Sequence, residues 1–311
     1  MGEDLDVNNC LDPEPDDGSA SAKARRRRLT KGAIALIIVG CFIFLILAFL
    51  FVGWITFMHV DNTAYVWHPD YEQVDIGEIL DKYLVDGEEL TDEDYDTLYA
   101  QTGVTKIGVD RALAYGSSGK TRLETIQKNY FTEHTVDHDK FSVPLVCTDF
   151  LDDVNSVSSI YLEPGDILVS SSTHIMGWKM GHCGIVTPSG RAMQAMAYGT
   201  PTYEASITYF TSRINFMVLR PKADDSVCEA AADTALGCKG VTYNALVGIF
   251  SKKNSMEHGT QCAHLVWYSY MQQGIDLDPN GGCLVLPKDI ASSPNVELVQ
   301  VFGFDPVTFK W

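Results

Sequence analysis

The sequence predicts an α+β fold in which helices pack on a mostly antiparallel sheet, preceded by one transmembrane helix and a helical segment. Residues 32–58 contain no charged side chain. From residue 165 onward, short strand-like stretches are followed by two helical stretches and then by more short strands. Strands and helices in this order are typical of an α+β protein rather than of alternating βαβ units.

The apolar stretch 32–58 is long enough to cross a membrane. A bilayer core of about 30 Å needs about 20 helical residues, and the additional length accommodates tilt. A secretory signal peptide has a shorter apolar core and a small-residue cleavage site, whereas this stretch ends in Trp54, Phe57 and Met58. Trp54 suits the membrane–water interface. We therefore predict one transmembrane helix over 32–58.

The charges that flank this helix predict its orientation. Four arginines at positions 25–28 and Lys31 directly precede it, and the far side opens with Asp61. Positively charged flanks stay on the cytoplasmic side of a membrane. We therefore expect a single-pass protein of the cell membrane with a cytoplasmic N-terminus and an extracytoplasmic folded part, residues 59–311.

The acidic residues are concentrated in two stretches. The net charge is −18; residues 1–20 carry seven acids and no Lys or Arg, and residues 61–100 carry 13 acids against Lys82 alone. Such runs are usually solvated tails and linkers. Nucleic acid is not an expected partner, because phosphate binding needs a basic surface. The predicted segments are a disordered cytoplasmic tail (1–31), the transmembrane helix (32–58), a linker (59–75), a helical accessory segment (76–159) and a folded domain (160–311).

Local signals place the helices. Thr91 followed by acids at 92–94 predicts a helix start, and Gly103 predicts its end just after Gln101. The other helices are expected over 123–131, over 224–236, and over 261–273 with Thr260 as the cap and Gly274 at the end.

Turn signals place the strands. The sequence Pro188-Ser189-Gly190 predicts a tight turn that joins two strands in a hairpin. The expected strands cover residues 166–170, 181–187, 191–197 and 214–220.

The eight cysteines do not have the spacing of a disulfide framework or a zinc ribbon, since the chain has no Cys-x-x-Cys pair. Cys228 and Cys238 lie on one predicted helix, about 15 Å apart, whereas a disulfide needs Cα atoms within about 7 Å of each other. We expect no bridge between them. His258, Cys262 and His264 match no common zinc spacing. We therefore expect neither a metal nor a cofactor.

Cys262 lies at the start of a predicted helix, in a setting that suits a nucleophile. A helix N-terminus carries about half a positive charge and free N–H groups, and such sites lower the pKa of a cysteine. His182, at the start of a predicted strand, is the candidate base, and Gln194 on the next strand is placed to orient its imidazole. On spacing alone, a buried structural cysteine and a core histidine remain the simpler explanation.

Three motifs change this interpretation. Gly165-Asp166-Ile167-Leu168, the run GHCGIV at 181–186 and the run QCAHLVWYSY at 261–270 resemble the permuted papain-like cysteine hydrolases. These form the circularly permuted branch of the NlpC-type superfamily, and the YiiX-like group is the most similar. The resemblance covers about residues 160–305. It implies a permuted papain-like fold in which the histidine strand precedes the cysteine helix.

The resemblance assigns roles to particular residues. It implies that Cys262 is the nucleophile, that His182 is the base, and that Tyr243, in a Gly-x-x-Tyr turn, is an oxyanion or substrate hydrogen-bond donor. The family often has an acidic residue where Gln194 stands, so the third catalytic role stays open, with Glu204 as an alternative. Trp178 lines the cleft wall or belongs to an ordinary loop.

Three functions remain open from the sequence. The first is a cysteine peptidase or amidase that cleaves amide bonds through an acyl-enzyme, with cell-wall peptides as the natural substrate beside a membrane. The second is a lipid acyltransferase or phospholipase, because the Cys-x-His-x-Val run at 262–266 also resembles the lecithin–retinol acyltransferase group. The third is a non-catalytic binding domain of the same fold. Cys183, next to His182 on the strand, is expected to face the opposite side as a core thiol.

Overall fold

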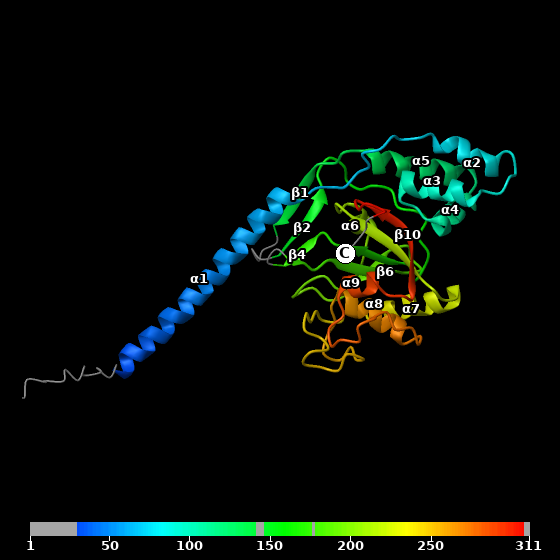
Figure 1. Cartoon of the computed structure of the whole chain (residues 1–311). Helices are drawn as coiled ribbons and strands as arrows, with labels where there is room; N and C mark the ends of the chain where they lie inside the picture. Colours follow the sequence, from blue (N-terminus) through cyan, green and yellow to red (C-terminus); the bar gives the residue numbers. More distant parts are fainter. Residues whose placement is uncertain (1–29, 141–145, 176–177, 308–311) are drawn as a thin grey trace, which may run out of the picture. The chain divides into compact units, whose positions relative to one another are not determined.

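The computed structural model describes residues 30–140, 146–175 and 178–307 (Figure 1). The chain divides into two compact units, residues 1–48 and 49–311. Helix α1, Lys31–Thr63, contains an apolar stretch over Lys31–Thr56 that is long enough to cross a membrane, and the most apolar part of this stretch has no buried residue. Both membrane anchors and signal sequences have such a helix near the N-terminus. Most of the predicted cytoplasmic tail lies outside the described residues.

Four helices follow in the second unit. They are α2 (Ile76–Leu84), α3 (Asp92–Thr102), α4 (Lys106–Leu113) and α5 (Ser117–Phe131). The predicted start of α3 is confirmed: Thr91 and Asp94 bond each other's backbone N–H groups in a capping box, and Gly103 ends the helix in the left-handed conformation. These hydrogen bonds satisfy backbone groups that a helix end otherwise leaves free.

The helical prediction for 76–159 is wrong in its last part. Two strands occur there, β1 (Val136–Lys140) and β2 (Val146–Leu151). They join β4 (Thr173–Ile175) and β5 (Trp178–Lys179) in an antiparallel sheet of order β1-β2-β4-β5. Pairing with distant residues decides the structure of these short stretches, since Asp149 on β2 accepts hydrogen bonds from His138 (2.8 Å) and His174 (2.7 Å) on the neighbouring strands.

A second, six-stranded antiparallel sheet forms the centre of the unit, in the order β10-β9-β3-β6-β7-β8. Its strands are β3 (Ile167–Ser170), β6 (His182–Val186), β7 (Ala192–Gln194), β8 (Tyr203–Ala205), β9 (Phe216–Pro221) and β10 (Val296–Phe302). The predicted hairpin is confirmed as β6–β7, with Val186 opposite Ala192. The expectation of an α+β protein with an antiparallel sheet is also confirmed.

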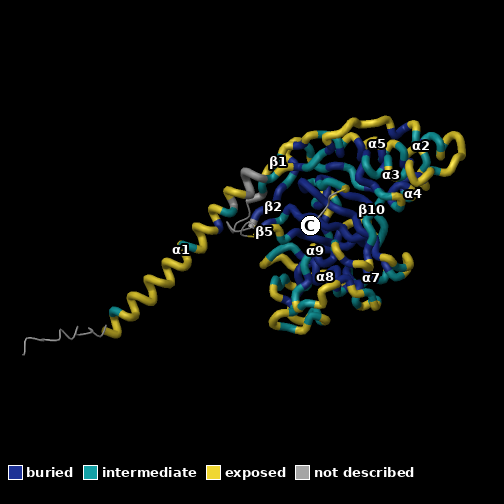
Figure 2. The backbone as a smooth tube through the Cα atoms, in the orientation of Figure 1, coloured by how far each residue is buried: buried dark blue, intermediate teal, exposed yellow. Residues whose placement is uncertain are grey.

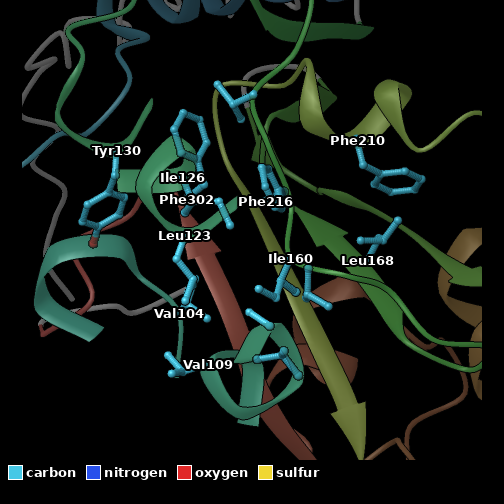
Figure 3. Close-up of a cluster of buried hydrophobic side chains, with 14 of the residues drawn as sticks. Val104, Val109, Leu123, Ile126, Tyr130, Ile160, Leu168, Phe210, Phe216 and Phe302 are labelled. Carbon is cyan, nitrogen blue, oxygen red and sulfur yellow. The ribbon is translucent and has the colours of Figure 1, made fainter. Parts of the chain in front are cut away.

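The two faces of this sheet belong to different hydrophobic clusters, because successive side chains of a strand point to opposite sides. Leu168, Phe216 and Val218 join the buried residues of α2–α5 and α6 (Thr208–Thr211), as Figure 3 shows for Leu168, Phe210 and Phe216. Ile167 and Ile185 face the other cluster. Both layers of helices therefore fix the sheet, and Figure 2 shows its interior as buried.

The remaining helices are α7 (Asp225–Gly237), α8 (Cys262–Met271) and α9 (Pro287–Ala291). Residues of α7 and α8 share a hydrophobic cluster with β3 and β6. Cys228 and Cys238, at the two ends of α7, are both free thiols, as are the other cysteines in the described part of the chain. This packing brings the first turn of α8 against the beginning of β6.

Candidate active site

Cys262 is the first residue of α8 and is 8% exposed. Gln261 caps the helix: its side-chain oxygen accepts from the N–H of Ala263 at 2.8 Å and lies 3.4 Å from the Cys262 sulfur.

The prediction that Thr260 caps this helix is wrong, because its hydroxyl pairs instead with the Nδ1 atom of His264 at 2.8 Å. His264 also contacts the carbonyl of Lys253 through Nε2, so both ring nitrogens are occupied and the residue is structural.

The Cys262 sulfur lies near both residues at the start of β6, because each of them affects its pKa. The thiol of Cys183 hydrogen-bonds it and lowers its pKa most, and His182 lowers the pKa further by hydrogen bonding and by charge, against the opposing effect of burial. The pKa of Cys183 is raised, mainly by burial and then by the same contact. In this pair Cys262 is therefore the thiol that ionises first. The side chain of Cys183 lies on the opposite face of strand β6 from His182, and α8 packs on the face where Cys183 lies.

His182 is held by Gln194 on β7. Its Nε2 atom lies 2.7 Å from the Gln194 side-chain oxygen, which can only accept a hydrogen bond. Nε2 therefore carries the proton, and Nδ1 is the ring nitrogen with a lone pair. The ring also stacks on Phe210, with centroids 5.4 Å apart, and meets the edge of Tyr209. The amide nitrogen of Gln194 is buried and has no hydrogen-bond partner among the described residues.

Arg213, a further charged residue near the site, is not among the residues predicted from the sequence. Its side chain is fully buried and donates to the hydroxyls of Ser172 (3.1 Å) and Thr173 (2.7 Å). Burial lowers its pKa, while the charges of Tyr209 and Cys262 oppose that effect. One of its terminal nitrogens, Nη2, is buried without a partner in the described part of the molecule. The only signal in the sequence is an arginine inside an apolar stretch, beside a strand.

Tyr243 lies near Cys262. Burial raises the pKa of its hydroxyl, and the charge of Cys262 raises it further. Its ring contacts the ring of Tyr198 at 5.1 Å, edge to face, and Tyr198 is 69% exposed.

Two other candidate residues lie elsewhere. Trp178 is 76% exposed on β5, opposite Ile175, and no described contact joins it to Cys262. The alternative orienting residue, Glu204, is wrong for that role. Its carboxylate accepts from Thr187 at 3.0 Å and from Ser189 at 2.9 Å, so it is committed to the β6–β7 turn.

No metal site is evident where the structure describes the chain: no group of three or more His, Cys, Asp or Glu side chains there is arranged to hold an ion. His138, Asp149 and His174 meet in the smaller sheet as hydrogen-bond partners. Their contacts hold three strands together.

Comparison with known proteins gives one structural match. No family model matches the chain, and no curated protein matches it. Among solved structures, the metalloprotein yiiX of Escherichia coli O157:H7 is similar at 14% identity, over 44% of this chain and 96% of that one, with a TM-score of 0.34. The likeness is weak, so any assignment of function depends on the geometry of the site itself.

Proposed function

We propose that the chain is a membrane-anchored cysteine hydrolase with a permuted papain-like arrangement, which cleaves amide bonds outside the cytoplasm through an acyl-enzyme. The observation that carries this proposal is the proximity of three side chains: Cys262 at a helix N-terminus, His182 close enough to lower the pKa of its thiol, and Gln194 hydrogen-bonded to Nε2 of the imidazole. A nucleophile, a base and an orienting residue in this relation are what acyl transfer requires.

In the proposed reaction, the lone pair on Nδ1 of His182 takes the proton of the Cys262 thiol, and the resulting thiolate attacks the carbonyl carbon of the scissile amide. A C–S bond forms, and the carbonyl oxygen takes the negative charge. We assign the N–H group of Cys262, which has no acceptor within the helix, and the hydroxyl of Tyr243 as the donors to that oxygen. When the C–N bond breaks, His182 gives its proton to the leaving amine. Water, with one proton taken by Nδ1 of His182, then attacks the thioester. The C–S bond breaks, a carboxylate is released, and His182 returns the proton to the Cys262 sulfur.

A peptide of the cell wall is the substrate class that fits an enzyme anchored in this way. Full-length protein and its Cys262→Ala variant are incubated with peptidoglycan fragments and with small peptide amides, and products are identified by mass spectrometry. Products from the wild type alone, with masses of amide hydrolysis, support the proposal. No product from either protein, together with ordinary thiol reactivity at Cys262, supports the non-catalytic binding domain instead.

The second candidate function is acyl transfer or hydrolysis on lipids. The observation that favours it is apolar surface close to the site: Leu246, Ile249 and Phe250 are exposed on the loop that follows Tyr243. Phospholipids therefore belong in the same incubation. Ester cleavage that depends on Cys262, without amide cleavage, would select this candidate.

A further inference from the structure

The loop after Tyr243 exposes large apolar side chains. Leu246 is 44% exposed, Ile249 46% and Phe250 84%. This stretch, coloured between yellow and orange in Figure 1, forms a loop in the region of α8, and Figure 2 shows exposed backbone there. Single exposed apolar residues are common, whereas three within five positions of one turn are characteristic of an interaction surface.

The fold holds this loop in place. Val247, between the exposed residues, is itself buried, at 1% exposed. Gly248 has a φ of +93° and packs against the carbonyl oxygen of Cys283, where a side chain would overlap it. Asn244 fixes the start of the turn, because its side chain accepts from the N–H of Leu246 at 3.0 Å and donates to the carbonyl of His258 at 2.8 Å. The apolar side chains are thus displayed by a structured turn.

The charge of this segment differs from that of the rest of the chain. Residues 244–256 contain two lysines and no acid, in a chain whose net charge is −18. Lys253 pairs with Asp278, and Lys252 is exposed beside Phe250. Apolar side chains next to a lysine are typical of segments that enter the bilayer interface, because the apolar groups reach the acyl chains while the cation stays among anionic headgroups.

Chain length limits how far the folded unit can be from a bilayer. The apolar part of α1 ends at Thr56, and Val66 is already buried in the core of the folded unit. Ten residues span at most about 33–36 Å even when fully extended, and α1 continues to Thr63, which shortens this reach. If α1 crosses the membrane, the folded unit stays beside the bilayer surface.

We propose that the turn of residues 244–253 is a membrane-docking loop, which inserts Leu246, Ile249 and Phe250 into a bilayer with anionic headgroups. Tyr243 directly precedes this loop and lies near Cys262, so docking brings the candidate site to the headgroup region. The proposal rests on α1 as the membrane anchor of the proposed function, but it does not depend on the proposed reaction, because it concerns the depth of the loop and not turnover.

The test measures that depth in the full-length protein. A background with Cys10, Cys41 and Cys283 changed to Ser, and with Cys262→Ala, leaves only buried thiols in the described folded unit. Phe250→Cys, Leu246→Cys or, as the control, Val85→Cys is then labelled with an environment-sensitive fluorophore. Val85 is a matched control because it is also apolar and is 75% exposed. Each protein is reconstituted into nanodiscs of phosphatidylcholine, with or without phosphatidylglycerol.

We expect the labels at 246 and 250 to shift to the blue and to be quenched severalfold more by lipid-borne nitroxide than the label at 85. Quenching should increase with phosphatidylglycerol, and Lys252→Glu should abolish that increase. Equal quenching of positions 250 and 85 by aqueous iodide, with none from lipid, would overturn the proposal. A label shielded from both quenchers and crosslinked to a second copy would also overturn it, in favour of a protein interface.

Discussion

Replacing Gln194 with leucine should separate the reactivity of the site from the stability of the fold. The leucine keeps much of the volume of the glutamine but cannot accept the 2.7 Å hydrogen bond from His182 Nε2. A buried donor without its partner costs about 1–3 kcal/mol. Every 1.4 kcal/mol is a factor of about ten, so the reactive orientation of the imidazole should be populated roughly 5- to 150-fold less.

The readout needs no substrate. The rate of alkylation of Cys262 by iodoacetamide near neutral pH, followed by mass spectrometry of the peptide that contains Cys262, reports on the His182–Cys262 contact. We expect the alkylation rate of Cys262 in Gln194→Leu to be roughly 5- to 150-fold lower than in the wild type.

Stability should change much less, because the glutamine already has a buried amide nitrogen without a partner in the described structure. Losing that group offsets part of the cost of the unpaired imidazole N–H. We expect the urea midpoint to stay near that of the wild type. An unchanged alkylation rate would refute the role of Gln194 in orienting His182, and a collapse of the urea midpoint would show that the residue is structural.

Three further outcomes follow from the structure. Hydrogen bonds from Cys183 and then from His182 hold the pKa of Cys262 well below that of an ordinary thiol. Alkylation of Cys262 should therefore persist at an acidic pH where an unstructured cysteine peptide no longer reacts. Cys183→Ala should narrow this difference, and Cys228→Ala, a buried thiol on α7, should not. Gly248→Ala should destabilise the fold by more than the roughly 1–2 kcal/mol of a left-handed residue, measured by urea unfolding against Gly274→Ala, where φ is +81° and the space is open. The pKa of Asp94 is lowered to about 2, first by Lys82 and then by Thr91. The Asp94 carboxylate therefore stabilises the fold at any pH above the pKa of an unfolded aspartate. The difference in unfolding free energy between the wild type and Asp94→Asn should disappear as the pH falls toward 2.

Local signals in the sequence were sufficient where a short stretch determines its own structure. The capping box of Thr91 and Asp94 and the turn at Pro188-Ser189-Gly190 depend on neighbouring residues, and both elements form as predicted. Strands β1 and β2 could not be predicted in this way. Their side chains alternate too briefly for a clear pattern, and the hydrogen bonds of Asp149 to His138 and His174 come from distant parts of the chain.

The candidate site shows the same division. The motifs indicated Cys262, His182 and Gln194, and the fold brings these three together. They gave no indication of Cys183 or Arg213 as neighbours of the thiol. Strand alternation placed Cys183 on the side opposite His182, but only the packing of α8 on β6 shows that this side also meets the sulfur. A contact of this kind depends on the crossing of two elements that lie 80 residues apart in sequence.

These two neighbours matter because Gln194 carries no charge. A carboxylate in its place would favour the imidazolium form of His182 and, through it, the Cys262 thiolate. Here that stabilisation has to come from the sulfur's own surroundings. They comprise the N-terminus of α8, the hydrogen bond from Cys183 and, through charge, the buried Arg213. The site therefore stabilises the Cys262 thiolate directly, and a glutamine in the third position is compatible with a reactive thiol.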